Sequence, residues 1–259
     1  MSQQIKEATI RWIFFDIGNV IMNDDAAMAY LYAELHRSML RKGLSMTFAE
    51  LLEEREAAIQ KTGAGHWSVL AETYLGAEGH RSIRMSSAAF LRENYLEYHN
   101  VLPGMASVLR ELGSTYSLAA VANQMSAAES ALEASGLGDC FDFLALSENI
   151  GLNKPDRGLF SWALMRAGCE PDEVLMIGDR IDNDIAPARA MGLRTLWFSA
   201  PHREKGTPLG DEYSHQYLES QCRRSTASIG PVSAEETPDG KAHSAQELVE
   251  EIHRLAASA

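Results

Sequence analysis

The spacing of apolar residues changes twice along the chain and divides it into three parts. A continuous apolar run, Ile13–Phe15, ends at Asp16 and predicts a first buried strand. From 23 to 99 apolar residues recur every three or four positions, which is the spacing of amphipathic helices. Beyond Pro103, short apolar runs alternate with helical patterns. The chain is therefore predicted to be an α/β protein with a helical insert directly after its first strand.

The last part of the chain alternates strands and helices regularly. The predicted strands are 116–122, 141–146, 173–177 and 193–198, and the predicted helices are 126–135, 156–167, 182–191 and 245–255. Repeated strand-helix units predict a doubly wound, Rossmann-like parallel sheet that is covered on both faces. Ligands of such sheets bind at the carboxyl ends of the strands, so the functional residues are expected there.

Domain boundaries follow from the same patterns. We assign 1–22 and 100–259 to the Rossmann-like core and 23–99 to a cap domain of about four helices. Within the core, the stretch 199–240 is rich in Gly, Pro, Ser and charged residues, so it is expected to form an irregular excursion.

Composition excludes several classes of function. The chain has 259 residues, 46% of them apolar, which is enough for a sizeable core. Its 36 acidic and 23 basic residues give a net charge of −13, so we expect neither nucleic acid nor a membrane as a partner. Three scattered cysteines do not suggest disulfides, and no apolar run approaches the roughly 18 residues that span a bilayer. We expect a soluble cytoplasmic protein.

Acidic residues follow two of the predicted strands. Asp16 ends the first strand, and Asp179 ends another, with Asp182 and Asp184 a few residues later. Carboxylates gathered at one sheet edge suit a divalent cation and an acidic nucleophile. Taken singly, each acid has a structural explanation. Capping a turn would explain Asp16, an interaction with the helix dipole would explain Asp184, and Asp182 is best explained as a helix N-cap. The two strands together favour a functional site.

Four motifs occur in a fixed order. They are Asp16-Ile17-Gly18-Asn19-Val20, Val121-Ala122-Asn123-Gln124, Asn153-Lys154-Pro155, and Gly178-Asp179 with Asn183-Asp184. With these motifs the chain resembles the haloacid dehalogenase-like hydrolase superfamily, most of whose members are magnesium-dependent phosphatases. The resemblance covers 11–198 and the closing helix, and the helical insert stands where one subfamily carries its cap domain.

The resemblance implies a role for each motif. Asp16, Asp179, the carbonyl of Gly18 and Asp184, directly or through water, would hold Mg²⁺. Lys154, which alone could be a solvated loop lysine, would set its ammonium against Asp16 and the transferring phosphoryl group. Asp16 would be the nucleophile, and water would hydrolyse the aspartyl-phosphate. The expected substrate is a small phosphorylated metabolite.

Two positions depart from the family pattern. Gly18 replaces the Asp that in most family phosphatases protonates the leaving oxygen, a contribution on the order of 10² to 10⁴ in rate. Ala122 replaces the usual Ser or Thr that donates a hydrogen bond to the phosphate. Asn123 and the backbone amides of that turn are then the expected ligands of a phosphate oxygen. Substrates whose leaving group needs little protonation, such as acyl or anomeric phosphates, would tolerate Gly18 best.

The helical insert offers substitutes for the missing groups. Asp24 or Asp25 could supply a proton, although capping of the first insert helix explains this pair more simply. His66 is a candidate acid and substrate contact, because His66-Trp67 lies where family caps carry substrate-selecting loops. A packed or surface aromatic pair explains the same dipeptide more simply.

Three other interpretations compete with a phosphatase. A catalytically impaired relative that binds a phosphorylated ligand or a protein partner is motivated by Gly18 together with Ala122. A 2-haloacid dehalogenase uses the same nucleophile without metal, but metal-free members lack the two acids present here as Asp179 and Asp184. A phosphomutase depends on the acid that Gly18 has replaced.

Overall fold

The computed structural model describes residues 9–62, 65–207 and 210–257. The chain forms two compact units, which we call the sheet unit and the helical unit. The sheet unit consists of Met1–Ile21, Val101–Ala200 and Gly230–Ala259, and the helical unit consists of Met22–Asn100 and Pro201–Ile229. The chain therefore enters the helical unit twice, although the sequence predicted a single visit.

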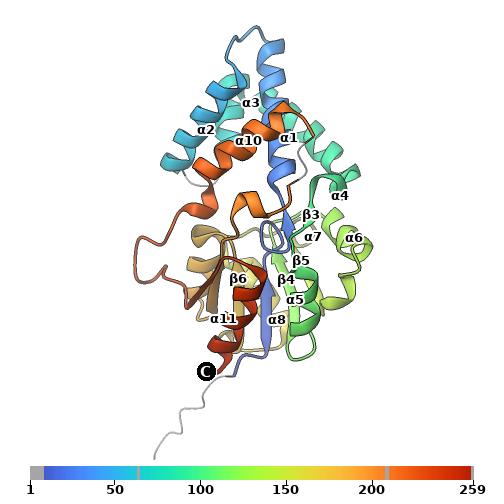
Figure 1. The fold of residues 1–259 in the computed structure, drawn as a ribbon, viewed down its shortest axis with the longest axis vertical. Helices are drawn as coiled ribbons and strands as arrows, with labels where there is room; N and C mark the ends of the chain where they lie inside the picture. The colour runs from blue at the N-terminus through green and yellow to red at the C-terminus, as the bar shows by residue number, and fades with distance from the viewer. Residues whose placement is uncertain (1–8, 63–64, 208–209, 258–259) are drawn as a thin grey trace, which may run out of the picture. The chain divides into compact units, whose positions relative to one another are not determined.

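The sheet unit contains a six-stranded parallel sheet with the strand order β5-β4-β1-β6-β7-β8 (Figure 1). Its strands are β1 (Trp12–Phe15), β4 (Ser117–Ala122), β5 (Phe143–Leu146), β6 (Val174–Gly178), β7 (Arg194–Phe198) and β8 (Gly240–Ala242). The central β1 pairs with β4 and β6, and its residues Ile13–Phe15 are fully buried. The predicted Rossmann-like fold class is confirmed.

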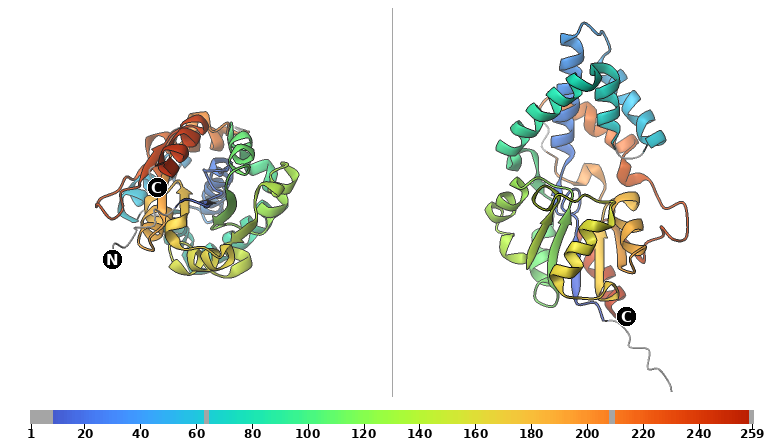
Figure 2. Two further views of the ribbon diagram at one scale, coloured as in Figure 1. Left: turned by 90° about the horizontal axis from the view of Figure 1, so that it is seen from below. Right: turned by 180° about the vertical axis from the view of Figure 1, so that it is seen from behind.

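Helices cover both faces of this sheet. They are α5 (Met105–Leu112), α6 (Ala127–Ala134), α7 (Ser147–Ile150), α8 (Arg157–Ala167), α9 (Ala186–Arg189) and α11 (Ala245–Ala257), with short turns η1 (Gly138–Cys140), η2 (Pro171–Glu173) and η3 (Ile181–Ile185). Figure 1 shows α5 and α11 in front of the sheet, and Figure 2 shows α8, in yellow, on the opposite face. Phe160 of α8 packs there with Phe14, Val121 and Met176.

The register of the central strands brings three chain segments to one edge. Phe15 stands opposite Ala120 on one side and Ile177 on the other. The next residue, Asp16, continues the ladder because its N–H donates to the carbonyl of Ile177 at 2.8 Å. Parallel strands end together in this register, so the residues that follow β1, β4 and β6 share the carboxyl edge of the sheet.

The helical unit is built from helices and one small ribbon. It holds β2 (Met22–Asn23), β3 (Asn100–Val101, of which Val101 belongs to the sheet unit), α1 (Asp25–Arg41), α2 (Phe48–Thr62), α3 (His66–Glu93), α4 (Tyr95–Tyr98) and α10 (Glu212–Arg223), with the turns η4 (His202–Glu204) and η5 (Thr226–Ser228). Gly76 interrupts α3 with non-helical dihedrals (φ 72°, ψ 171°), so α3 is two helical pieces. Most of the described residues within the predicted helical region 23–99 are helical.

The prediction of an irregular excursion over 199–240 is wrong in two places. Residues Glu212–Arg223 form α10, which packs beside α1 and α2 in the helical unit (Figure 1), and Gly240–Ala242 forms the sixth strand of the sheet. Tyr217 of α10 is 1% exposed, and its ring centroid lies 5.6 Å from that of Tyr32. The composition concealed the helix because its buried face is partly polar, whereas three of the prolines that suggested a loop, Pro201, Pro231 and Pro238, lie outside it.

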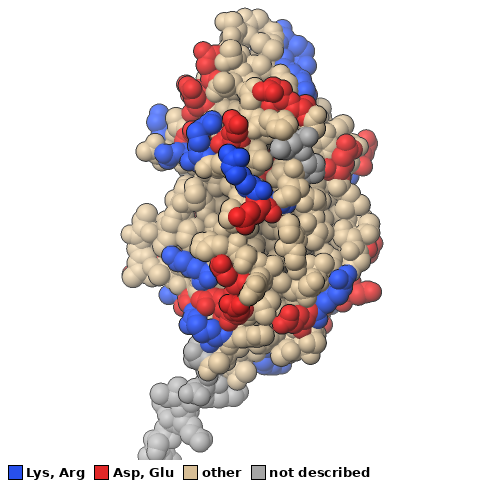
Figure 3. Space-filling view, in the orientation of Figure 1, with Lys and Arg blue, Asp and Glu red and all other residues tan. Residues whose placement is uncertain are grey.

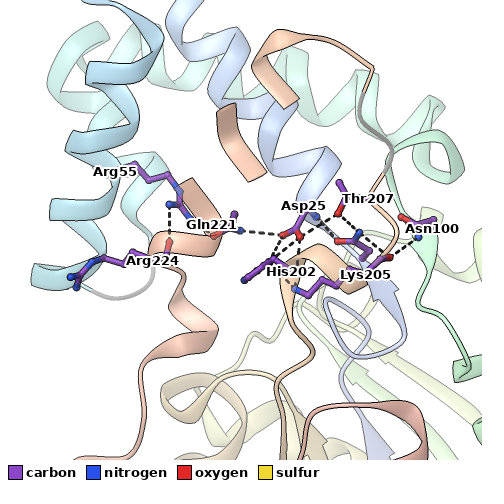
Figure 4. Close-up of polar contacts among 9 residues, drawn as sticks. Asp25, Arg55, Asn100, His202, Lys205, Thr207, Gln221 and Arg224 are labelled. Carbon is purple, nitrogen blue, oxygen red and sulfur yellow. Dashed lines mark hydrogen bonds and ion pairs between the residues drawn. The ribbon is translucent and has the colours of Figure 1, made fainter. Parts of the chain in front are cut away.

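A buried carboxylate anchors the second visit of the chain to the helical unit. Asp25, at the start of α1, is 1% exposed and its Oδ2 lies 2.9 Å from Nδ1 of His202 (Figure 4). Gln221 donates to its Oδ1 at 3.2 Å, and the Lys205 ammonium lies 3.9 Å from Oδ2. Burial opposes ionisation, but these partners prevail and hold the pKa of Asp25 below its usual value. A carboxyl group held ionised in this way is poorly suited to be a substitute proton donor.

Further hydrogen bonds extend this network. Asn23 and Asn100, on the paired strands β2 and β3, both donate to the carbonyl of Lys205, at 3.4 and 3.2 Å (Figure 4). The buried guanidinium of Arg55 donates to the carbonyl of Arg224 at 2.9 Å. Breaking a hydrogen bond to a buried charged group is costly, so the network holds 201–207 and 210–229 as a structural part of the helical unit.

We expect Asp24→Asn to change the pH dependence of stability. Burial is the main reason that the pKa of Asp24 is raised to about 7. The negative charge of Asp25 adds to the rise, and the positive charge of Lys205 opposes it. A raised pKa means that the contribution to stability is complete below the ordinary value of 3.8 and is lost as the pH rises to about 7. The free energy of unfolding of the wild type should therefore fall, relative to that of Asp24→Asn, by about 3 kcal/mol between pH 4.5 and pH 8.

Urea unfolding at both pH values measures this difference. The exposed Asp172 of the sheet unit provides the control, because Asp172→Asn removes a solvated carboxylate and should keep the wild-type pH dependence. Equal pH dependence in Asp24→Asn and the wild type would show that Asp24 ionises freely in the folded protein.

The surface is consistent with the composition. On the face drawn in Figure 3, basic side chains are interspersed with acidic ones. None of the helices in the described part of the chain combines the length and apolar character that crossing a membrane requires.

Candidate active site

The first motif presents Asp16 directly after the central strand. Asp16 is 8% exposed, and its Oδ1 accepts a hydrogen bond from the N–H of Ile17 at 2.8 Å. Asn19 turns the chain away with a left-handed φ of 56°, a conformation that Asn tolerates better than most residues. The turn therefore fixes one oxygen of the Asp16 carboxylate at the end of the strand.

The fourth motif brings two more carboxylates to Asp16. Asp179 follows β6, and Asp184 lies in η3, a π-helical turn. One oxygen of each of the three carboxylates lies within 4.8 Å of the others, and all three residues are buried. Gly178 permits this approach, because a Cβ atom there would stand 2.2 Å from the Cβ of Asp184. Because η3 takes up the first residues of the predicted helix 182–191, that segment is an α-helix only over Ala186–Arg189.

Lys154 supplies a cation to this cluster. Its side chain is fully buried, and its Nζ lies 2.6 Å from Oδ1 of Asp184 and 3.0 Å from Oδ1 of Asp16. Burial alone would lower the pKa of Lys154, but the two carboxylates outweigh it and raise the pKa above its ordinary value. Lys154 is therefore a permanent positive charge between two of the acids.

The protonation of Asp16 is closely balanced. Burial raises the pKa of Asp16 to about 7, Lys154 opposes this rise, and the charge of Asp184 adds to it. Both oxygens of Asp184 are engaged, Oδ1 by Lys154 and by Asn183 at 3.1 Å and Oδ2 by the N–H of Arg180 at 3.1 Å. Such a site gains from further positive charge, because three buried carboxylates face one ammonium ion.

The second motif lies next to Lys154. Ala122 is fully buried at the end of β4, and its side chain offers no hydrogen-bonding group. The Asn123 side chain binds the peptide groups of Lys154, donating to its carbonyl at 2.8 Å and accepting from its N–H at 2.7 Å. The predicted contact of this turn with a phosphate oxygen stays a prediction.

None of the contacts described so far involves His66 or Gly18, which are also predicted site residues. His66 belongs to the helical unit, where it begins α3, is 8% exposed and has its Nδ1 2.6 Å from the Tyr32 hydroxyl. Gly18 is buried in the turn after β1. A substrate contact of His66 and a metal contact of the Gly18 carbonyl remain predictions.

The sequence did not reveal several neighbours of the acids. The indole N–H of Trp197 donates to the carbonyl of Asp179 at 2.9 Å, from the position opposite Gly178 in the β6–β7 register. Asn183 stands inside the fourth motif, but its contact with Asp184 was not predicted, whereas nothing in the sequence marks Trp197. The N-cap predicted for Asp182 is wrong, since Arg180 holds that place and the Asp182 carboxylate pairs with its guanidinium at 2.6 Å.

Gly178→Ala is expected to displace Asp184. The added methyl group must overlap the Asp184 side chain, so the free energy of unfolding should fall by roughly 1–3 kcal/mol. Affinity for Mn²⁺ should fall by about 10- to 100-fold, because one carboxylate no longer faces the other two. Urea unfolding and Mn²⁺ binding followed by electron paramagnetic resonance measure the two effects.

Gly230→Ala is the matched control for that change, because no atom lies within 4 Å of the added Cβ. It should unfold and bind Mn²⁺ like the wild type. Unchanged Mn²⁺ affinity in Gly178→Ala would mean that the position of Asp184 does not matter for the cation.

The family comparison accounts for this geometry. The model of the haloacid dehalogenase-like hydrolases matches residues 10–192, which include all four motifs. The protein therefore belongs to the haloacid dehalogenase-like hydrolase family, and the resemblance inferred from the motifs is confirmed.

Two named relatives are similar to this chain over only part of its length. The chain is 40% identical to the pyrimidine 5'-nucleotidase YjjG of Escherichia coli over 107 residues, which are 40% of this chain and 47% of that enzyme, so it spans about half of that relative's length. It is 27% identical over 199 residues to the glyceraldehyde 3-phosphate phosphatase of Methanocaldococcus jannaschii, covering 72% of this chain and 84% of that enzyme.

Solved structures show the same fold. The magnesium-bound HAD-hydrolase YfnB of Bacillus subtilis superposes with a TM-score of 0.63 at 20% identity, covering 93% of this chain and 98% of that one. A HAD phosphatase of Thermococcus onnurineus superposes with a TM-score of 0.60 at 19% identity, covering 93% and 97%. At these identities the likeness concerns the fold.

Proposed function

We propose that the protein is a magnesium-dependent phosphatase of a small phosphorylated metabolite that works through an aspartyl-phosphate at Asp16. The observation that carries the proposal is the group of three buried carboxylates at the carboxyl edge of the sheet, two of which, Asp16 and Asp184, are bridged by the Lys154 ammonium. Both relatives named above are phosphate-removing enzymes by name, which supports the same reaction class for this chain.

The donor set of this cluster fits magnesium. Mg²⁺ binds oxygen ligands, prefers one or two carboxylates, and keeps several waters or phosphate oxygens in its shell. Asp16 and Asp179 would be direct ligands, the carbonyl of Gly18 would be a third, and Asp184 would bind through water because its oxygens already accept hydrogen bonds. When bound, the ion would supply positive charge against the phosphate oxygens.

The chain's own residues would carry the two chemical steps. An oxygen of the Asp16 carboxylate attacks phosphorus, and the bond from phosphorus to the leaving oxygen breaks with its electron pair on that oxygen. Water then attacks the phosphorus of the acyl phosphate, which frees Asp16 and inorganic phosphate. Lys154 lowers the repulsion between the anionic nucleophile and the phosphate dianion, and its ion pair holds Asp16 in place.

A panel of phosphorylated metabolites assayed for phosphate release with and without Mg²⁺ tests this proposal. Release that requires Mg²⁺ is the expected result. No release from any member with the metal present would favour the impaired binding protein suggested by Gly18 and Ala122.

We predict that the leaving group controls the rate in this enzyme. Because no acid stands at Gly18, acyl and anomeric phosphates should be hydrolysed about 10² to 10⁴ times faster than alkyl phosphates of similar size. Comparing kcat/KM for acetyl phosphate, glucose 1-phosphate and glucose 6-phosphate measures the difference. Equal values for the two glucose phosphates would mean that another residue supplies the proton.

A further inference from the structure

The Lys154 peptide is held by a single side chain. Both hydrogen bonds of the Asn123 amide go to the backbone of Lys154, at 2.8 and 2.7 Å. Within the described residues, neither the N–H nor the carbonyl of Lys154 has another hydrogen-bond partner. An amide that pairs with a peptide in this way extends the hydrogen bonding of a strand by one step.

The two partners differ in how firmly the fold holds them. Asn123 directly follows β4, which pairs with β1 and β5 and has fully buried residues at its end. Lys154 lies in the irregular connection between α7 and α8, outside any helix or strand. The hydrogen bonds of the Asn123 amide therefore tie the loop at Lys154 to the end of β4, because Lys154 itself belongs to no helix or strand.

From this geometry we infer that Asn123 is a positioning residue, which sets the place of the Lys154 ammonium between Asp16 and Asp184. The inference rests on the proposed function, and it gives Asn123 a role other than direct binding of phosphate. Nζ of Lys154 lies 2.6 Å from Oδ1 of Asp184 and 3.0 Å from Oδ1 of Asp16, so a small shift of the Lys154 backbone would break one of these contacts. Misplacement of a charged group by about 1 Å can cost on the order of 10²-fold in rate.

Asn123→Ala is the central variant of the test. Its kcat should fall by about 10- to 100-fold, whereas KM and the inhibition constant of inorganic phosphate should stay at the wild-type values. In a Lys154→Met background the same change should cause no additional loss, because the group that Asn123 positions is already gone. Should Asn123→Ala fail to fold, Asn123→Ser, which keeps a small polar residue in the turn, replaces it.

Ser126→Ala is the matched control. Ser126 lies in the same connection after β4, and its Oγ donates to Glu148 at 2.8 Å. The substitution Ser126→Ala therefore also removes a side-chain hydrogen bond from this connection. Its kcat should equal that of the wild type. A weaker inhibition by phosphate in Asn123→Ala with unchanged kcat, or a full repeat of its loss in the Lys154→Met background, would show that Asn123 binds the substrate directly and would overturn the inference.

Mn²⁺ binding tests the inference without turnover. In both single variants the Lys154 ammonium is displaced or absent, so the carboxylates carry more uncompensated negative charge. Asn123→Ala and Lys154→Met should therefore each bind Mn²⁺ with an affinity at least about threefold above that of the wild type. The double variant should have the same Mn²⁺ affinity as Lys154→Met. If no substrate is hydrolysed, the proposed function fails, and this measurement still decides the inference. Tighter binding in Lys154→Met but not in Asn123→Ala would contradict it.

Discussion

Replacing Asp16 with Asn is expected to abolish magnesium-dependent phosphate release, with a loss on the order of 10⁴-fold or more. The change removes the carboxylate that is proposed to attack phosphorus, and it removes a proposed ligand of the cation. The residue keeps its shape and its hydrogen bond from Ile17, so the fold should persist. Initial rates on the best substrate of the panel, with and without Mg²⁺, measure the effect.

A matched variant separates this loss from a general loss of charge. Asp182→Asn lies on the same edge of the sheet, but its carboxylate is 57% exposed and pairs only with Arg180 among the described residues. It should retain activity within a few-fold of the wild type. An Asp16→Asn protein that releases phosphate as fast as Asp182→Asn would exclude Asp16 as the nucleophile.

Replacing Lys154 with Met is expected to damage both activity and stability. The side chain fits the same space, but Asp16 and Asp184 lose the cation that lies 3.0 and 2.6 Å from them. Removing one partner of a buried ion pair costs about 3–5 kcal/mol, so the metal-free variant should unfold at much lower urea concentration. Phosphate release should fall on the order of 10² to 10⁴-fold, because the phosphate dianion meets an uncompensated carboxylate.

Added Mg²⁺ distinguishes the two losses in Lys154→Met. It should restore part of the stability, because a divalent cation replaces some of the missing positive charge, but it should not restore the rate. Lys154→Arg, which keeps the charge with a larger head group, provides the comparison and should keep most of the stability. Stability of Lys154→Met equal to that of the wild type without metal would mean that the ion pairs contribute nothing.

Much of the sheet unit could be predicted from the sequence because buried parallel strands are continuous apolar runs. The strands after Tyr116, Asp142 and Glu173 begin within a few residues of their predicted starts for this reason. Helix α10 escaped prediction because residues such as Ser220 and Gln221 on its buried side are polar, and their burial depends on partners far away in the sequence. A periodic pattern of apolar residues cannot reveal such a helix.

The candidate site divides in the same way. Asp16, Asp179, Asp184 and Lys154 come together as expected. Asp16 and Asp179 directly follow parallel strands that share one edge, and Asp184 and Lys154 reach the same edge from the connections beside it. The hydrogen bonds of Asn123 could not be foreseen, since they depend on the path of a loop 31 residues away. The π-helical turn at Asp184 was likewise hidden, because helical periodicity does not distinguish it from an α-helix.

Chemical trapping of the intermediate tests the central claim most directly. The enzyme is mixed with its best substrate and Mg²⁺, quenched with sodium borohydride, which reduces an aspartyl-phosphate to homoserine, and mapped by peptide mass spectrometry. The proposed mechanism predicts homoserine at position 16, only with substrate present. Rapid phosphate release with an unmodified Asp16, or with the reduction at another carboxylate, would contradict the mechanism.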